Sequence, residues 1–395
     1  MRFLHWPLAF IVGGFGLGLL CSTSATMAAS ATTLYSFTGG ADGSMPFAGL
    51  VPDKGGDLYG TAWGGGLTST NCESFGCGTV FKVDPVNPSF KVLHRFTGGA
   101  DGGNSSSTLI VGGNGNLYGT TQRGGTAGFG TVFEVGVDGQ ENVLYSFNGG
   151  TEDGVDPEGS LILKGGNLYG LTTGGGTAGA GTIFKLTPSG TKGHPAWNET
   201  VVHSFRGGRD GAYPNYGGLT PDDAGNLYGT TAAGGTANEG TIFKLAKDGR
   251  ESVLCEFMGT QRGIPLGGLV IDKGGNLYGT SFDPGSVFKA TPDGALSTLH
   301  RFAGTDDGAF PEGNLVMNAA GDFFGTTSAG GTFDGGTVFE LGKGGNEKIL
   351  HSFPFNGLES SQPVAGLILY NGGKLFGTTL TGGERAMGSV FVVTQ

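Results

Sequence analysis

Aspartates that are each followed by glycine recur along the chain, and they are the first residues whose type and spacing suggest chemistry. They are Asp42, Asp101, Asp153, Asp210 and Asp307. Such a set could bind a cation or sugar hydroxyls, or supply an acid and a base from different repeats. Asp-Gly pairs are also standard turn formers, and we favour this structural interpretation. A calcium loop needs several oxygen ligands close together, which one aspartate about every 50 residues does not provide.

Most of the histidines occupy a single position of a sequence repeat, namely His94, His203, His300 and His351. Other copies fill this position with Tyr35, Tyr145 and Cys255. Equivalent positions in a ring of repeats are spread around its rim, so these histidines cannot converge on one ion. Without clustered ligand spacing, the sequence predicts no metal site. Nothing in it calls for a cofactor, and a structural calcium ion has no support.

Aromatic and charged residues stand where loops interrupt the repeat, and repeat proteins tend to place specific sites on such loops. The candidates are Trp63, Arg123, Tyr213, Tyr216, Asp283 and Arg385. Exposed Trp, Tyr and Arg are frequent binding anchors, and Trp63 is the first choice because it adjoins an insertion with two cysteines. The alternative for Trp63 is a packing role, as a plug over the centre of the repeat array.

Motifs of known enzymes are missing from the sequence. It contains no Gly-x-Ser-x-Gly elbow and no His-Glu-x-x-His motif. Glycine runs that resemble nucleotide-binding loops, such as residues 113–119, are expected by chance in a chain with 84 glycines. The sequence therefore leans towards a protein that is not an enzyme, without deciding the question.

Three short patterns recur in tandem and define the repeat that positions these residues. The first, Leu-Tyr-Gly-Thr and its variants, is centred on Tyr59, Tyr118, Tyr169, Tyr228, Tyr278, Phe324 and Phe376. The second, Gly-Thr-Val-Phe, ends at Phe81, Phe133, Phe184, Phe243, Phe288, Phe339 and Phe391. The third, Leu-His/Tyr-x-Phe, has copies 45–59 residues apart that end at Phe37, Phe96, Phe147, Phe205, Phe257, Phe302 and Phe353.

A fourth apolar segment precedes the Leu-Tyr-Gly-Thr pattern, as at residues 49–51, 109–111, 161–163 and 367–369. All four segments are short, rich in β-branched or aromatic residues and bounded by turn formers, which predicts strands. Four strands in seven copies predict an all-β, seven-bladed β-propeller of four-stranded antiparallel blades over residues 32–395. The chain starts with a lone outermost strand, residues 33–37, which we expect to complete the blade formed by the last three strands. An open β-solenoid is the alternative.

The motifs Asn-Leu-Tyr-Gly-Thr-Thr, Gly-Thr-Val-Phe-Lys-Leu and Leu-x-Ser-Phe-x-Gly-Gly-x-Asp-Gly resemble the GloVer tandem repeat of exported bacterial proteins, over residues 33–395. This resemblance implies an exported protein with one of several alternative surface anchors and no assigned activity. The chain ends at its last strand without a C-terminal sorting segment, which leaves anchoring open. The second strand also resembles the Asp-x-x-Gly-Asn-Leu-Tyr stretch of NHL-type propellers, which include both binding modules and enzymes.

The N-terminus has the features of a signal peptide. Met1 and Arg2 precede an apolar run, residues 8–20, and a small-residue stretch, residues 22–31. The run is short for a membrane span, and no later stretch approaches spanning length. We therefore expect residues 1–31 to be a signal peptide and the mature chain to be secreted, periplasmic or at the cell surface. Lipidation at Cys21 is the alternative.

Export makes the cysteines interpretable. Cys72 and Cys77 lie in one glycine-rich loop, and in an oxidising compartment we expect a disulfide between them. Two unlinked thiols are the alternative, and Cys255 is expected to be a packed, unreactive thiol. The net charge of −11 and the scattered basic residues argue against a nucleic-acid partner.

These features predict an exported, monomeric, non-catalytic binding or scaffold module. Its ligand would be a glycan, a small molecule or a partner protein, held on the loop-rich face of the propeller. The rival hypothesis is a hydrolase or lyase whose carboxylates come from different blades at the channel mouth. Because propellers carry both kinds of function, the fold alone does not decide between them.

Overall fold

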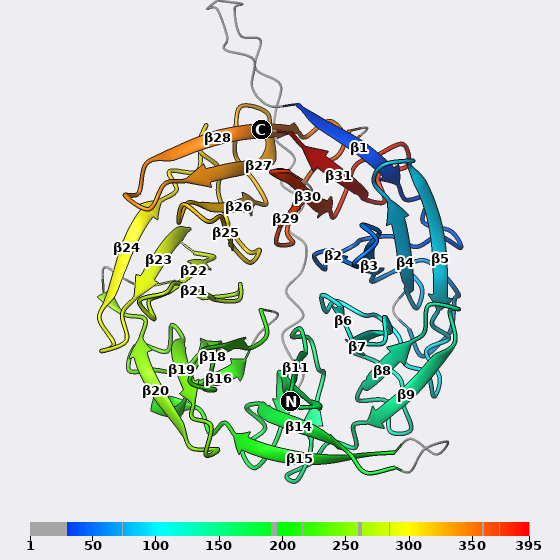
Figure 1. Cartoon of the computed structure of the whole chain (residues 1–395), viewed down its shortest axis with the longest axis vertical. Coiled ribbons are helices and arrows are strands. Elements are labelled where there is room, and N and C mark those ends of the chain that lie inside the picture. Colours follow the sequence, from blue (N-terminus) through cyan, green and yellow to red (C-terminus); the bar gives the residue numbers. More distant parts are fainter. Residues whose placement is uncertain are drawn as a thin grey trace, which may run out of the picture.

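The computed structural model describes residues 30–72, 74–190, 196–214, 217–259, 263–283, 285–357, 359–370 and 372–394. Seven antiparallel sheets, the blades, are arranged around a common axis (Figure 1). The innermost strand of each blade lies nearest this axis, and the fourth strand forms the rim. The predicted seven-bladed β-propeller is confirmed. The element η1 (Gly208–Asp210) is a single 3-10 turn.

The first four blades follow the chain in order, from the axis outwards. Blade 1 contains β2 (Val51–Pro52), β3 (Leu58–Ala62), β4 (Thr79–Asp84) and β5 (Ser89–Arg95). Blade 2 contains β6 (Ile110–Val111), β7 (Leu117–Thr121), β8 (Thr131–Val135) and β9 (Glu141–Ser146). Blade 3 contains β11 (Ile162–Lys164), β12 (Asn167–Thr172), β14 (Thr182–Pro188) and β15 (Trp197–Ser204). Blade 4 contains β17 (Thr220–Pro221), β18 (Leu227–Ala233), β19 (Thr241–Leu245) and β20 (Glu251–Glu256).

The remaining blades follow the same order, except that the last one uses both ends of the chain. Blade 5 contains β21 (Val270–Ile271), β22 (Leu277–Ser281), β23 (Ser286–Ala290) and β24 (Leu296–Arg301). Blade 6 contains β25 (Val316–Met317), β26 (Phe323–Thr327), β27 (Asp334–Leu341) and β28 (Glu347–Pro354). Blade 7 contains β29 (Ile368–Tyr370), β30 (Lys374–Thr379), β31 (Ser389–Val393) and β1 (Ala31–Ser36). The loops add β10 (Gly154–Val155), β13 (Gly174–Gly175) and β16 (Ala212–Pro214).

The glycine of the Leu-Tyr-Gly-Thr pattern makes room for a phenylalanine of the next strand. Gly60 in β3 lies opposite Phe81 in β4, and a Cβ atom added to Gly60 would meet the Phe81 ring at 2.6 Å. Each of the other blades repeats this pair, with 2.4–2.7 Å to the corresponding ring. The glycine therefore allows the phenylalanine ring to lie flat across the blade, at a position where any side chain would collide.

The hydrophobic core is divided among the interfaces between adjacent blades. At the interface of blades 1 and 2, Val80 packs against Phe96, Leu117 and Phe133, all of them fully buried. The rings of Phe96 and Phe133 meet edge to face at 5.1 Å between centroids. The same edge-to-face pair recurs at the other interfaces, so the recurring phenylalanines of the third and fourth strands hold neighbouring blades together.

The ring is closed by contacts between residues from opposite ends of the sequence. Strand β1 pairs antiparallel with β31 at the rim of blade 7. Near the axis, the Thr378 hydroxyl donates to the backbone oxygen of Ala48 at 3.0 Å, which joins blade 7 to blade 1. Equivalent threonine hydroxyls bridge other blade interfaces, for example Thr326 to the Ala365 oxygen at 2.9 Å. The last interface is thus built like the others.

The described residues contain no helix that is long and apolar enough to span a membrane. Residues 1–29, which include Cys21 and all but the last two residues of the expected signal peptide, lie outside the described residues. The signal peptide and the lipidation alternative therefore stay predictions.

Candidate functional site

The repeated aspartates each fold back onto their own loop and do not converge on one another. Asp42 accepts hydrogen bonds from the Thr38 backbone N–H at 2.7 Å and from the Tyr35 hydroxyl at 2.8 Å. Burial alone would raise the pKa of Asp42, but the hydrogen bonds from Thr38 and Tyr35 outweigh it, and the pKa is lowered. Asp101 accepts from Thr97 in the same way. These carboxylates shape the connection from the outermost strand to the next blade.

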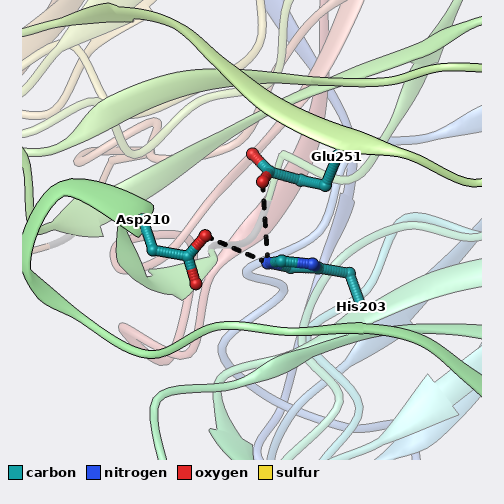
Figure 2. A group of neighbouring side chains, drawn as sticks. All are labelled: His203, Asp210 and Glu251. Atoms are coloured by element: carbon teal, nitrogen blue, oxygen red, sulfur yellow. Dashed lines mark ion pairs between the residues drawn. The ribbon is translucent and has the colours of Figure 1, made fainter.

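Each aspartate also belongs to a cluster between neighbouring outer strands. Each cluster has three parts. They are the His or Tyr two residues before the last phenylalanine of one outer-strand segment, the aspartate of the following loop, and the first residues of the next outer strand. In Figure 2, His203 of β15, Asp210 of η1 and Glu251 of β20 show this arrangement. His203 Nε2 lies 3.4 Å from Asp210 Oδ1 and 3.7 Å from Glu251 Oε2. The cluster therefore joins blade 3 to blade 4 at the rim.

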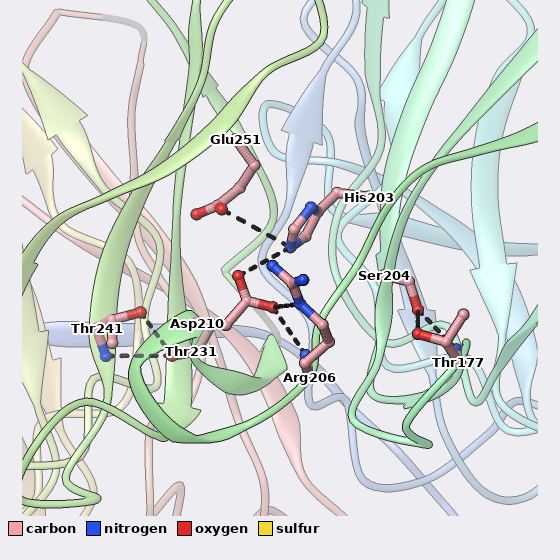
Figure 3. Close-up of polar contacts among 8 residues, drawn as sticks. All are labelled: Thr177, His203, Ser204, Arg206, Asp210, Thr231, Thr241 and Glu251. Atoms are coloured by element: carbon pink, nitrogen blue, oxygen red, sulfur yellow. Dashed lines mark hydrogen bonds and ion pairs between the residues drawn. The ribbon is translucent and has the colours of Figure 1, made fainter.

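Burial governs the electrostatics of this cluster. It raises the pKa of Glu251 to about 7, with repulsion from Asp210 adding to the effect. It lowers the pKa of His203, although the neighbouring Asp210 opposes that change. Figure 3 shows Arg206 holding the other oxygen of Asp210, with the backbone N–H at 2.8 Å and Nε at 3.3 Å. At neutral pH the imidazole is therefore neutral and sits between two carboxyl groups.

The cluster is repeated with conservative and apolar variants around the rim. His-Asp-Glu sets recur as His94, Asp101 and Glu141, and as His300, Asp307 and Glu347. A Tyr-Asp-Glu set is formed by Tyr145, Asp153 and Glu199. Two positions are apolar instead, where Phe90 stacks on Tyr35 at 3.6 Å and where Leu296 packs near Cys255. The burial of Cys255 raises its thiol pKa to about 12, as suits a packed thiol.

Sequence reasoning missed the glutamates of these clusters. Their signal was present in the sequence, because Glu141, Glu199, Glu251 and Glu347 each stand six residues before the last phenylalanine of an outer strand. The partners of each histidine are carboxyl groups of its own loop and of the next outer strand, not histidines of other blades.

Trp63 directly follows strand β3. It lies on the face formed by the connections between the second and third strands of each blade and between the outermost strand and the next blade, which we call the loop face. Its indole Nε1 donates to Gln122 Oε1 at 2.9 Å, and its ring meets Phe47 edge to face at 6.0 Å. Gln122 in turn donates to Ser106 at 3.0 Å and to Glu158 at 2.8 Å. These residues come from the loops of blades 1, 2 and 3, so Trp63 is one end of a polar chain that crosses three blades.

The cystine insertion is fastened beside Trp63. Cys72 and Cys77 form a disulfide, and Cys77 is fully buried. The Asn104 amide donates to the backbone oxygens of Trp63 at 3.0 Å and of Gly76 at 2.9 Å. Asn104 thus holds the insertion and the tryptophan in a fixed relation.

The loop face carries a set of non-glycine residues with positive φ. They occupy the same place in successive blades and are Met45, Asn104, Asp156, Tyr213, Phe310 and Gln362, with φ between 51° and 58°. In most of these blades the backbone oxygen of this residue accepts the N–H of the residue after the second strand, for instance Met45 from Trp63 at 3.1 Å. Strained backbone of this kind persists only where the surrounding structure holds it, and it is frequent at binding sites.

Several large side chains on these loops are exposed to solvent. Phe47 is 37% exposed, Tyr213 44% and Phe310 41%. The Phe282 and Phe310 rings stack at 5.0 Å. The loop face therefore presents aromatic rings from several blades.

The other predicted residues are dispersed on the same loops. The backbone of Arg123 pairs with that of Gly103 in an isolated antiparallel β-bridge. Arg385 is exposed, and Asp283 lies in the short loop of blade 5. Tyr216 lies outside the described residues. The described part of the loop face thus brings Trp63 close to Phe47 and Gln122 but does not gather the predicted arginines and aspartates into one pocket.

Geometry and repeat together define a seven-bladed β-propeller built from a single tandem unit. Residues 65–286 and 280–395 match the Gloeobacter/Verrucomicrobia repeat, and the chain belongs to this family. The family resemblance inferred from the motifs is thereby confirmed. A comparison with curated proteins gives no match.

Solved structures with this fold cover nearly the whole chain. A catalytically inactive virginiamycin B lyase from Staphylococcus aureus with quinupristin is 12% identical, with a TM-score of 0.62, over 93% of this chain and 99% of the lyase. The extracellular domain of a putative one component system from B. thetaiotaomicron is 13% identical, with a TM-score of 0.60, over 93% of this chain and 42% of that one. At these identities the likeness shows the fold alone.

Proposed function

We propose that this propeller is an exported, monomeric, non-catalytic module that binds a glycan on its loop face, with Trp63 as the principal contact. The proposal rests on the way in which neighbouring side chains hold the Trp63 ring in one orientation. Its ring is oriented by Gln122 and Phe47 and lies beside a disulfide-closed insertion. A rigidly held aromatic ring with few rotatable bonds is the usual anchor of a binding surface.

The neighbouring groups favour a sugar over an apolar ligand. Sugars present hydroxyl groups along their edges and C–H groups on their faces. The aromatic rings of Trp63 and Phe47 suit the faces, while the side chains of Gln122 and Glu158 suit the hydroxyl groups. The net charge of −11 favours a neutral or basic glycan over a polyanion.

A binding role is favoured over catalysis because the repeated aspartates are each engaged in their own loops. Asp42, Asp101 and Asp307 accept backbone N–H groups four residues upstream, at 2.7–2.9 Å. Catalysis by an acid and base pair would need two such carboxylates on one substrate.

One loop-face carboxyl group favours the rival hypothesis of a hydrolase or lyase. Burial raises the pKa of Glu312, whose Oε1 accepts a hydrogen bond from the Ser328 hydroxyl at 2.7 Å. A protonated carboxyl at this position could act as a general acid. Turnover that is lost in Glu312→Gln would support this alternative, whereas binding without turnover would support our proposal.

The test is a glycan array probed with the mature protein and two variants. We expect Trp63→Ala to abolish binding, while Val137→Ala keeps it, because Val137 is exposed in the turn between β8 and β9, at the other end of the strands from Trp63. Equal binding by the wild type and Trp63→Ala would reject the assignment of the site. A wild-type protein that binds no glycan, on an array that detects a control lectin, would reject the ligand class.

A further inference from the structure

The cluster of His203, Asp210 and Glu251 leaves buried polar atoms without hydrogen bonds. His203 Nε2 and Glu251 Oε1 are buried and make no hydrogen bond of good geometry, although Nε2 lies 3.4 Å from Asp210 Oδ1. The Glu251 side chain is only 6% exposed, and Figure 2 shows its carboxylate directed at the imidazole, on the side where Asp210 also points. Buried polar atoms are nearly always satisfied, so a missing partner for both groups calls for an explanation. A bound cation would give His203 Nε2 a partner and would hold Glu251 through Oε2, the oxygen that faces the imidazole.

The separations of the three groups fit a transition metal. A tetrahedral zinc ion, with nitrogen and oxygen ligands at about 2.0–2.2 Å, places its ligand atoms about 3.4 Å apart. The His203 nitrogen lies 3.4 Å from Asp210 and 3.7 Å from Glu251. One ligand atom from each residue lies within 4.8 Å of the other two. Side-chain adjustments would therefore bring these three atoms into tetrahedral positions, with a water molecule as the fourth ligand.

We propose that His203 Nε2, Asp210 Oδ1 and Glu251 Oε2 bind a divalent transition-metal ion such as Zn²⁺, which fastens the outer strands of blades 3 and 4 to each other. The ion balances the negative charge of the two carboxyl groups that face the imidazole. Surrounding groups hold the ligands in place. Arg206 binds Asp210 through Oδ2 and leaves Oδ1 free for the ion, and Phe205 packs edge to face on the His203 ring at 4.8 Å.

The repeat adds support, because the two other histidine clusters leave both a histidine and a glutamate atom without a hydrogen bond, whereas the Tyr145 cluster leaves only Glu199 Oε1 without one. His94 Nε2 and Glu141 Oε1 are buried without hydrogen bonds, and so are His300 Nε2 and Glu347 Oε1. Among the described residues, only the His203 cluster has all three ligand atoms within 4.8 Å of one another. We therefore assign the tightest site to blades 3 and 4 and regard the other two as weaker copies.

Zinc binding to the untagged mature protein tests the proposal. The protein is stripped with a chelator, dialysed and titrated with ZnCl₂ by isothermal calorimetry, and bound metal is counted by elemental mass spectrometry. Glu251→Gln removes a ligand, and Glu251→Leu is a second variant that the fold accommodates, because Leu296 fills the equivalent position. Glu199→Gln is the matched control, since Tyr145 replaces the histidine in its cluster. Circular dichroism confirms that each variant is folded.

We expect both Glu251 variants to lose the tightest equivalent of zinc that the wild type and Glu199→Gln retain. We also expect zinc to raise the unfolding temperature of the wild type and of the Glu199 variant but not of the Glu251 variants. A wild type that binds no zinc, or Glu251 variants that bind it with unchanged stoichiometry and affinity, would overturn the proposal. Since the cluster lies at the rim, these results are independent of glycan binding by Trp63.

Discussion

Replacing Phe37 by alanine measures whether the first strand closes the ring in solution. Phe37 directly follows β1 and is fully buried, and its ring meets Tyr35 and Phe81 at 5.3 and 5.2 Å. Phe147 is the same repeat position in the middle of the chain, also fully buried, with Tyr145 and Phe184 at 5.2 and 5.1 Å. The two residues fill matching spaces between blades. Their alanine variants should therefore lose nearly the same stability.

The expected loss follows from the cavity that each substitution leaves. A buried Phe→Ala change costs about 3–5 kcal/mol. For a domain of about 360 residues, with an unfolding entropy of about 2.1 cal/mol/K per residue, a loss of about 4 kcal/mol lowers the unfolding temperature by about 5 °C. We expect this shift for both variants in thermal unfolding followed by circular dichroism. A shift of about 1 °C or less for Phe37→Ala, with the full shift for Phe147→Ala, would refute docking of the first strand.

Two further predictions concern packing and pH. Gly60→Ala should lower the free energy of unfolding by about 1–3 kcal/mol, because the added Cβ lies 2.6 Å from the Phe81 ring. Gly113→Ala is the control and should cost little, because no atom lies within 4 Å of its added Cβ. Equal melting temperatures for the two variants would contradict this prediction. Burial raises the pKa of Glu199 to about 7, above its ordinary 4.5, so the folded protein loses stability as the pH rises from about 4.5 through 7. Glu199→Gln should match the wild type near pH 4.5 and exceed it by about 1 kcal/mol at pH 8, after allowance for solvent screening of this half-exposed group. Urea unfolding across this pH range checks the sign, and a variant that is less stable at pH 8 would be inconsistent with it.

The blades could be predicted from the sequence because the residues that pack within and between blades recur in each short repeat unit. A glycine opposite a phenylalanine, as with Gly60 and Phe81, recurs at a fixed place in each unit, so counting the pattern counts the blades. The lone strand before Phe37 likewise predicted where the array had to close.

The contacts between units were harder to infer, because they join residues whose spacing varies with loop length. His203 and Glu251 are 48 residues apart, whereas the equivalent Tyr145 and Glu199 are 54 apart. The positive φ of residues such as Met45 was equally hidden, since a methionine gives no local signal for that conformation. It is enforced by the hydrogen bond that its oxygen accepts from Trp63.

Hydrogen exchange on the mature protein, with and without the strongest glycan from the array, tests the central claim that the loop face is the binding surface. We predict slower exchange in peptides that cover residues 44–47 and 61–66, and unchanged exchange in the turns at residues 85–88 and 136–140, which connect the two outermost strands of blades 1 and 2. Protection confined to those turns, with none around Trp63, would contradict the account.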